Sequence, residues 1–140
     1  MSHVWKVGYL FQALLTTSLA VYDLRTRRVP NEIVLPWFFV ALVVTMGMWP
    51  AEGLALRLVF PLMLFLLWHL GVLGGADAKV WTALWLTTPP EHLLIGLSIA
   101  GLCLFFGGLV GLLIWKPGSP APGLWKAVPY GAWLAWTVWR

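Results

Sequence analysis

The two aspartates of the chain, Asp23 and Asp77, are the residues best suited to do chemistry, since each adjoins a long apolar segment. They lie 54 residues apart, but alternation of the chain across a membrane would put both on the same side. Carboxylates at membrane depth tend to face the bundle interior, and two brought together share a proton. One can then take a proton from water while the other polarises a peptide carbonyl. Alternatively, each ends a helix at the lipid headgroups, where Arg25 or Lys79 balances its charge.

The composition around these acids is that of a membrane protein. Of the 140 residues, 61% are hydrophobic and 10% are charged, against roughly 25% charged in an average soluble domain. The mean hydropathy is +0.86. These values exclude soluble globular, disordered and collagen-like classes, and we expect a single multi-span membrane domain over residues 1–140.

Six apolar segments predict an all-α membrane protein with six transmembrane helices. The segments cover residues 4–22, 33–49, 54–73, 78–88, 93–115 and 128–139. The fourth and sixth contain only 11 and 12 residues, which corresponds to a rise of ~16–18 Å. Two of the predicted spans are therefore short, and they need a thinned bilayer or support from flanking loops.

The basic residues predict how the spans are oriented. The loops at 23–32, 74–79 and 116–127 share one side of the membrane and contain Arg25, Arg27, Arg28, Lys79, Lys116 and Lys126. The other side has Lys6, Arg57 and Arg140. This six-to-three bias places the first set of loops, with both aspartates, at the cytoplasmic face of the plasma (inner) membrane.

The same charges predict the partners. A net charge of +4 in such a chain orients loops and contacts anionic membrane lipids, so we expect no nucleic-acid partner. Cys103 is the only cysteine, which excludes a disulfide framework and a thiolate zinc site. We expect no metal and no cofactor. Glycines in the fifth span favour either internal helix packing or a homodimer.

Short motifs surround both acids. Tyr22-Asp23 precedes Pro30-Asn31, and Gly74-Gly75-Ala76-Asp77-Ala78-Lys79 encloses the second acid. Val128-Pro129-Tyr130-Gly131 opens the last apolar segment. In order and topology, these motifs resemble those of the prepilin peptidase family, the GxGD-type intramembrane aspartic proteases, and the resemblance covers all six spans.

The resemblance implies an aspartic endopeptidase that removes the leader of type IV prepilin-like or preflagellin-like proteins at the cytoplasmic membrane face. It implies that Asp23 and Asp77 are catalytic. It also implies an active-site neighbourhood of Gly74, Gly75, Ala76, Lys79, Pro30, Asn31, Pro129, Tyr130 and Gly131. The chain resembles the short, cleavage-only members, because it has neither the length nor the cysteines of the N-methyltransferase region.

The residues around the two acids have expected supporting roles, and for Lys79 two roles are open. Ala76 replaces the second glycine of the family pattern, where a positive φ would be strained. Gly74 and Gly75 predict a tight bend before Asp77. Lys79 either stabilises the ionised Asp77 or reaches towards the headgroups. Pro30 and Asn31 suit a turn into the second helix, with Asn31 as its N-cap.

Two other functions fit the same aspartates. A proton-coupled transporter also uses paired acids, but a relay can space them along a path, whereas a peptidase needs both within reach of one water. A noncatalytic pilus-assembly scaffold would keep the fold without needing either acid.

The predicted topology can be tested by single-cysteine labelling in a Cys103→Ala background. Thr26→Cys and Ser119→Cys should both react with a membrane-impermeant thiol reagent from the cytoplasmic side, because both positions fall in the basic loops. Reaction from opposite faces would show that the span count is wrong.

Overall fold

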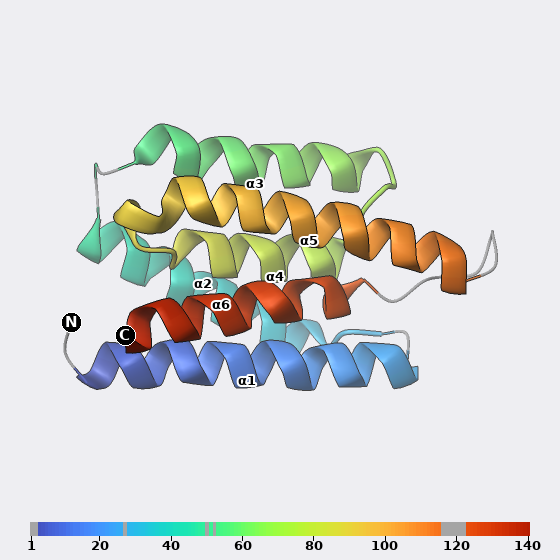
Figure 1. The fold of residues 1–140 in the computed structure, drawn as a ribbon, viewed down its shortest axis with the longest axis horizontal. Helices are drawn as coiled ribbons and strands as arrows, with labels where there is room; N and C mark the ends of the chain where they lie inside the picture. The colour runs from blue at the N-terminus through green and yellow to red at the C-terminus, as the bar shows by residue number, and fades with distance from the viewer. Residues whose placement is uncertain (1–2, 27, 50, 52, 116–122) are drawn as a thin grey trace. The chain divides into compact units, whose positions relative to one another are not determined.

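The structure is a computed structural model that describes residues 3–26, 28–49, 51, 53–115 and 123–140. All regular secondary structure in these stretches is helical (Figure 1), as predicted. The described α-helices are α1 (His3–Thr26), α2 (Asn31–Met48), α3 (Leu54–His69), α4 (Gly75–Leu86), α5 (Leu93–Ile114) and α6 (Val128–Trp139). Two short 3₁₀ helices, η1 (Pro90–His92) and η2 (Leu124–Ala127), precede α5 and α6. Arg27 and Lys116, which entered the charge bias, lie outside the described residues.

Three helical stretches among the described residues are long and apolar enough to cross a membrane. They are Trp5–Thr26, Asn31–Met48 and Pro90–Ile114. Helix α3 is apolar but has 16 residues, and α4 and α6 have 12 each. The structure thus supports a membrane protein, and a crossing by all six helices stays a prediction.

Helix α3 ends earlier than its apolar segment, so the prediction of a helix as far as residue 73 is wrong. Gly71 adopts a positive φ of 72°. Its N–H donates to the Trp68 carbonyl at 2.9 Å, and the N–H of Val72 donates to the Leu67 carbonyl at 2.9 Å. This is the left-handed glycine turn that closes helices, and it stops α3 although the residues after it are still apolar.

The chain divides into two compact units, which are described separately. Unit 1 comprises Met1–Val29 and Ile99–Arg140, and unit 2 comprises Pro30–Ser98. In unit 1, α1 and α6 lie side by side and run in opposite directions (Figure 1). A Cβ at Gly131 would lie 3.5 Å from Oγ1 of Thr16 and 3.6 Å from Cα of Ala13. These are ordinary contact distances, so α6 packs directly against α1 at Gly131, with room for little more than a methyl group.

In unit 2, α4 packs against both α2 and α3. Five of its side chains are completely buried: Val80, Trp81, Ala83, Leu84 and Trp85. The Phe60 ring of α3 lies 4.6 Å from the ring of Trp85 and 6.4 Å from that of Trp81, measured between centroids. Aromatic packing of this kind adds to the stabilisation from burial alone. The helix that carries Asp77 is thereby fixed along most of its length.

Side chains of α2 and α3 bond the C-terminal end of α4. Arg57, 2% exposed, donates from Nη1 to the Leu86 carbonyl at 2.6 Å and from Nη2 to the Thr88 carbonyl at 2.8 Å. Oγ1 of Thr45 lies 2.7 Å from the Leu86 carbonyl and 2.7 Å from the Ala41 carbonyl of its own helix, so these two acceptors share its one proton. A cation at this end also complements the helix dipole. The sequence counted Arg57 as a charge of the outer side, which stays a prediction. The structure adds that its guanidinium is buried, because the last carbonyls of a buried helix need donors.

Removing the guanidinium should destabilise the fold. We expect Arg57→Met to lower the free energy of unfolding by about 3 kcal/mol, because two buried carbonyls lose charge-assisted bonds. Thr45→Val, which removes one neutral bond, should cost about 1 kcal/mol. Thermal unfolding of the detergent-solubilised protein measures both changes.

The matched control is Arg28→Met, since Arg28 is an exposed cation. Its effect should stay within about 0.5 kcal/mol. Equal melting temperatures for Arg57→Met and Arg28→Met would show that the cap of α4 does not hold the fold.

Candidate active site

Asp23 lies in the last turns of α1 and is 6% exposed. Its Oδ2 accepts hydrogen bonds from the backbone N–H of Gly123 at 3.0 Å and of Leu124 at 3.4 Å. Gly123 caps η2, whose first N–H groups have no partner within the helix. A buried carboxylate at this place satisfies them, and it joins two segments of unit 1 that lie 100 residues apart in the sequence.

The two bonds define what this carboxylate can do. Both end on Oδ2, and an oxygen that accepts two N–H groups does not itself present a proton to them. The bonds also fix the orientation of the carboxylate plane relative to α1. Asp23 is therefore a buried carboxylate whose Oδ2 is held in place by two backbone donors.

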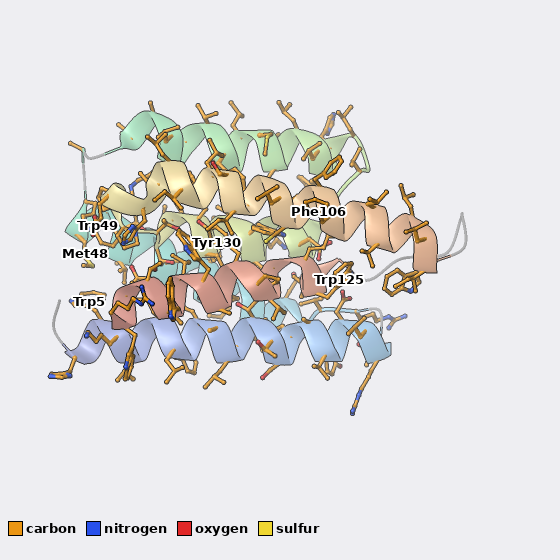
Figure 2. The ribbon with its side chains drawn as sticks, viewed as in Figure 1. Trp5, Met48, Trp49, Phe106, Trp125 and Tyr130 are labelled. Carbon is orange, nitrogen blue, oxygen red and sulfur yellow. The ribbon has the colours of Figure 1, made fainter. Side chains whose placement is uncertain are left out.

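The start of α6 belongs to the same unit as Asp23. Pro129 stands in the first turn, where a helix tolerates the missing N–H. Tyr130 (labelled in Figure 2) is completely buried, and its ring centroid lies 5.4 Å from that of Trp133. Gly131 contacts α1 at Thr16, as described above. The structure thus places this motif in the first turn of α6, with Gly131 against α1.

Asp77 lies in unit 2, in the first turn of α4, and is partly buried. Gly74 caps the helix in an extended conformation, with φ −68° and ψ 147°. A Cβ at Gly74 would lie 3.2 Å from Oδ2 of Asp77, and a Cβ at Gly75 would lie 3.1 Å from Nε1 of Trp68. Both distances are shorter than ordinary contacts of a Cβ atom, so these glycines give the carboxylate and the Trp68 ring their space.

Ala76 is helical, so the expected strain at this position does not arise. Among the described residues, positive φ values at glycine occur at Gly53 and Gly71. The sharp reversal of the chain before α4 is therefore made at Gly71 rather than at the residues next to Asp77. Alanine at position 76 fits the first turn of a helix without cost.

Lys79 bonds a different partner from either of the two expected. Its Nζ donates to Oδ1 of Asn31 at 3.1 Å, which ties the start of α4 to the start of α2. Two positions along a helix correspond to a rotation of about 200°, so Lys79 and Asp77 lie on opposite sides of α4. Lys79 thus acts as a link between helices.

The prediction that Asn31 caps α2 is wrong. Pro30 occupies the N-cap, and its carbonyl accepts hydrogen bonds from the N–H of Ile33 at 3.2 Å and of Val34 at 3.3 Å. Asn31 is the first helical residue, and its side chain serves the contact with Lys79 instead. A sequence pattern cannot reveal this choice, since the competing donor lies 48 residues away.

Asp23 belongs to unit 1 and Asp77 to unit 2, and the structure describes the surroundings of each carboxylate within its own unit. No group of three or more His, Cys, Asp or Glu side chains that could hold a metal ion occurs in the part of the chain that the structure describes.

Apolar helices of bilayer length and an immobilised carboxylate at the end of one of them define a membrane-embedded helical protein with a candidate acid–base group. The chain belongs to the type IV leader peptidase family, which matches residues 10–116. The match includes both aspartates and the Gly74–Lys79 segment, and it ends before α6. Comparisons with curated proteins and with solved structures give no match. The family makes the protein a protease with prepilin-like substrates.

The close contacts near Asp77 predict that two neighbouring substitutions have different effects on activity. Gly75→Val should reduce proteolysis strongly, because the larger side chain meets Trp68 at the base of the turn. Ala76→Gly should keep activity within about threefold, since the helix loses only ~1 kcal/mol of propensity. Cleavage of a co-expressed substrate measures both, and equal activity in the two variants would contradict the role assigned to small residues here.

Proposed function

We propose that the protein is an aspartic endopeptidase that removes the leader peptide of prepilin-like proteins at the cytoplasmic face of the plasma membrane, with Asp23 and Asp77 as its catalytic pair. The observation that carries the proposal is the state of Asp23: a buried carboxylate, held by two backbone N–H groups, inside the residues that match a protease family. Asp77 is the only other aspartate of the chain.

The geometry at Asp23 supports a division of labour. Because its Oδ2 accepts two N–H groups, Asp23 takes the role of general base and removes a proton from the attacking water. Asp77 carries the shared proton and donates it to the oxygen of the scissile carbonyl. As the tetrahedral intermediate collapses, one of its two hydroxyl groups returns its proton to Asp77, the C–N bond breaks, and the proton held by Asp23 passes to the leaving amine, so both carboxyl groups regain their starting states. No metal or covalent nucleophile takes part in this scheme.

The neighbouring residues have positioning roles in this proposal. Pro129, Tyr130 and Gly131 hold α6 against α1, the helix of Asp23. Gly74 leaves room for the carboxylate of Asp77. Neither group contributes an acid or a base to the reaction.

The exposed apolar side chains of the helices are what a substrate that lies in the membrane would require. Large apolar side chains of α1 are widely exposed, among them Val7 at 60%, Phe11 at 62% and Leu14 at 60%. Apolar surface of this extent suits lipid or a hydrophobic substrate helix. A leader cut at the membrane face, immediately before such a helix, fits this environment. Prepilin-like and preflagellin-like substrates fit it equally.

Replacing either aspartate should abolish cleavage. We expect Asp23→Asn and Asp77→Asn each to reduce the rate of leader removal by at least ~10²–10⁴-fold, because each removes one half of the acid–base pair. The double variant should be no slower than either single one, since the two groups act as a unit. Electrophoretic separation of precursor and processed substrate after co-expression measures the rate, and membrane fractionation checks insertion.

Glu32→Gln is the matched control, because Glu32 is an exposed carboxylate at the start of α2. It should cleave normally. Near-normal turnover by either aspartate variant would refute the catalytic pair. Additive losses in the double variant would refute its operation as a unit and favour separate acids, as in a proton relay.

A further inference from the structure

Unit 2 contains a cavity of about 360 Å³ among α2, α3 and α4. Its apolar wall comes from Phe38, Pro61, Phe65 and Trp68, and Lys79 and Thr82 stand on its α4 side. A volume of this order lies within the range of small-molecule binding sites, ~300–1,000 Å³. The cavity is therefore large enough to hold part of a ligand.

The cavity lies on the side of α4 that faces away from Asp77. The four α4 residues that line it, Gly75, Ala78, Lys79 and Thr82, follow the three- and four-residue spacing of one helix face. Asp77 is rotated by roughly 150° from the middle of that face. A peptide bond placed at Asp77 would not occupy this cavity, so the cavity needs a separate explanation.

The lining favours a hydrocarbon chain over a peptide. An extended peptide needs partners for its backbone N–H and C=O groups, and these groups are costly to bury without them. The wall comes from helices whose backbone groups bond within the helix, and the Thr82 hydroxyl already donates to the Ala78 carbonyl at 2.7 Å. An acyl chain has no such requirement.

The charge at the cavity favours an anion beside that chain. Lys79 donates to a neutral partner, Oδ1 of Asn31, and no carboxylate pairs with it among the described residues. An ammonium group has three donors, so two are available to a phosphate. Trp68 and Phe65 are 47% and 52% exposed beside it. A lysine with a tryptophan is the usual pair at the level of lipid headgroups.

We propose that this cavity is a binding site for one anionic phospholipid, with an acyl chain between α2, α3 and α4 and the phosphate bonded to Nζ of Lys79. The bound lipid would brace the starts of α2 and α4, which Lys79 and Asn31 already join. This site does not depend on the proposed proteolytic function.

The test uses the full chain, purified in neutral detergent, with a photoreactive phosphatidylglycerol whose reactive group is on the acyl chain. Mass spectrometry should place the adduct on the segment with Phe65 and Trp68. A photoreactive phosphatidylcholine should label about fivefold less, because one lysine at the headgroup is worth roughly that factor. Lys79→Met should remove this preference.

Asn31→Ala is the matched control. It breaks the same bond to Lys79 but keeps the charge, so the preference for phosphatidylglycerol should persist. Ala78→Phe, which fills the cavity, should lower labelling by both lipids. If Ala78→Phe does not fold, Lys79→Met and Asn31→Ala still decide, since neither adds volume to the cavity.

Three results would overturn the proposal. Equal labelling of the wild-type protein by the two lipids would remove the anion site. Protection from labelling by a prepilin-like peptide would make the cavity a peptide site. Competition by glycerol phosphate as strong as that by intact phosphatidylglycerol would leave a headgroup site without a bound acyl chain.

Discussion

The constraint on which this structure depends is the need to satisfy backbone N–H and C=O groups at helix ends in apolar surroundings. Water satisfies such groups at a protein surface, but buried helix ends need side-chain partners. At the end of α4 they are the guanidinium of Arg57 and the hydroxyl of Thr45. At the start of η2 it is the carboxylate of Asp23. The buried polar groups of Arg57, Thr45 and Asp23 thus have specific partners on the backbone.

This constraint links the fold to the proposed chemistry. The same two bonds that satisfy η2 also hold Asp23 still, so the residue proposed as general base is fixed by a structural need. In unit 2 the C-terminal end of α4 is fixed by Arg57, whereas its first turn, which carries Asp77, is tied through Lys79 to Asn31. Asp77 therefore sits at the end of α4 opposite to the one that Arg57 caps.

The sequence predicted what depends on local pattern. The six apolar segments and the all-α class follow from hydropathy, and each segment contains most of one helix. The end of α3 was missed because apolar residues continue past Gly71, and only the backbone turn shows that the helix has stopped. The cap at Asn31, the burial of Arg57 and the partners of Asp23 were missed for another reason. Each depends on a residue at least 29 positions away, and no short-range pattern encodes such a contact.

The short helix α4 is explained by the same partners. A helix of 12 residues is about 18 Å long, well below the ~30 Å of a hydrocarbon core. A helix as short as α4 cannot reach water at both ends across such a core, so its buried end needs other partners. The carbonyl of Leu86 at the end of α4 instead bonds Arg57 and Thr45, and both bonds are buried. Side chains of neighbouring helices therefore replace the water that this helix end would otherwise require, whereas the end of α6 is exposed at Trp139.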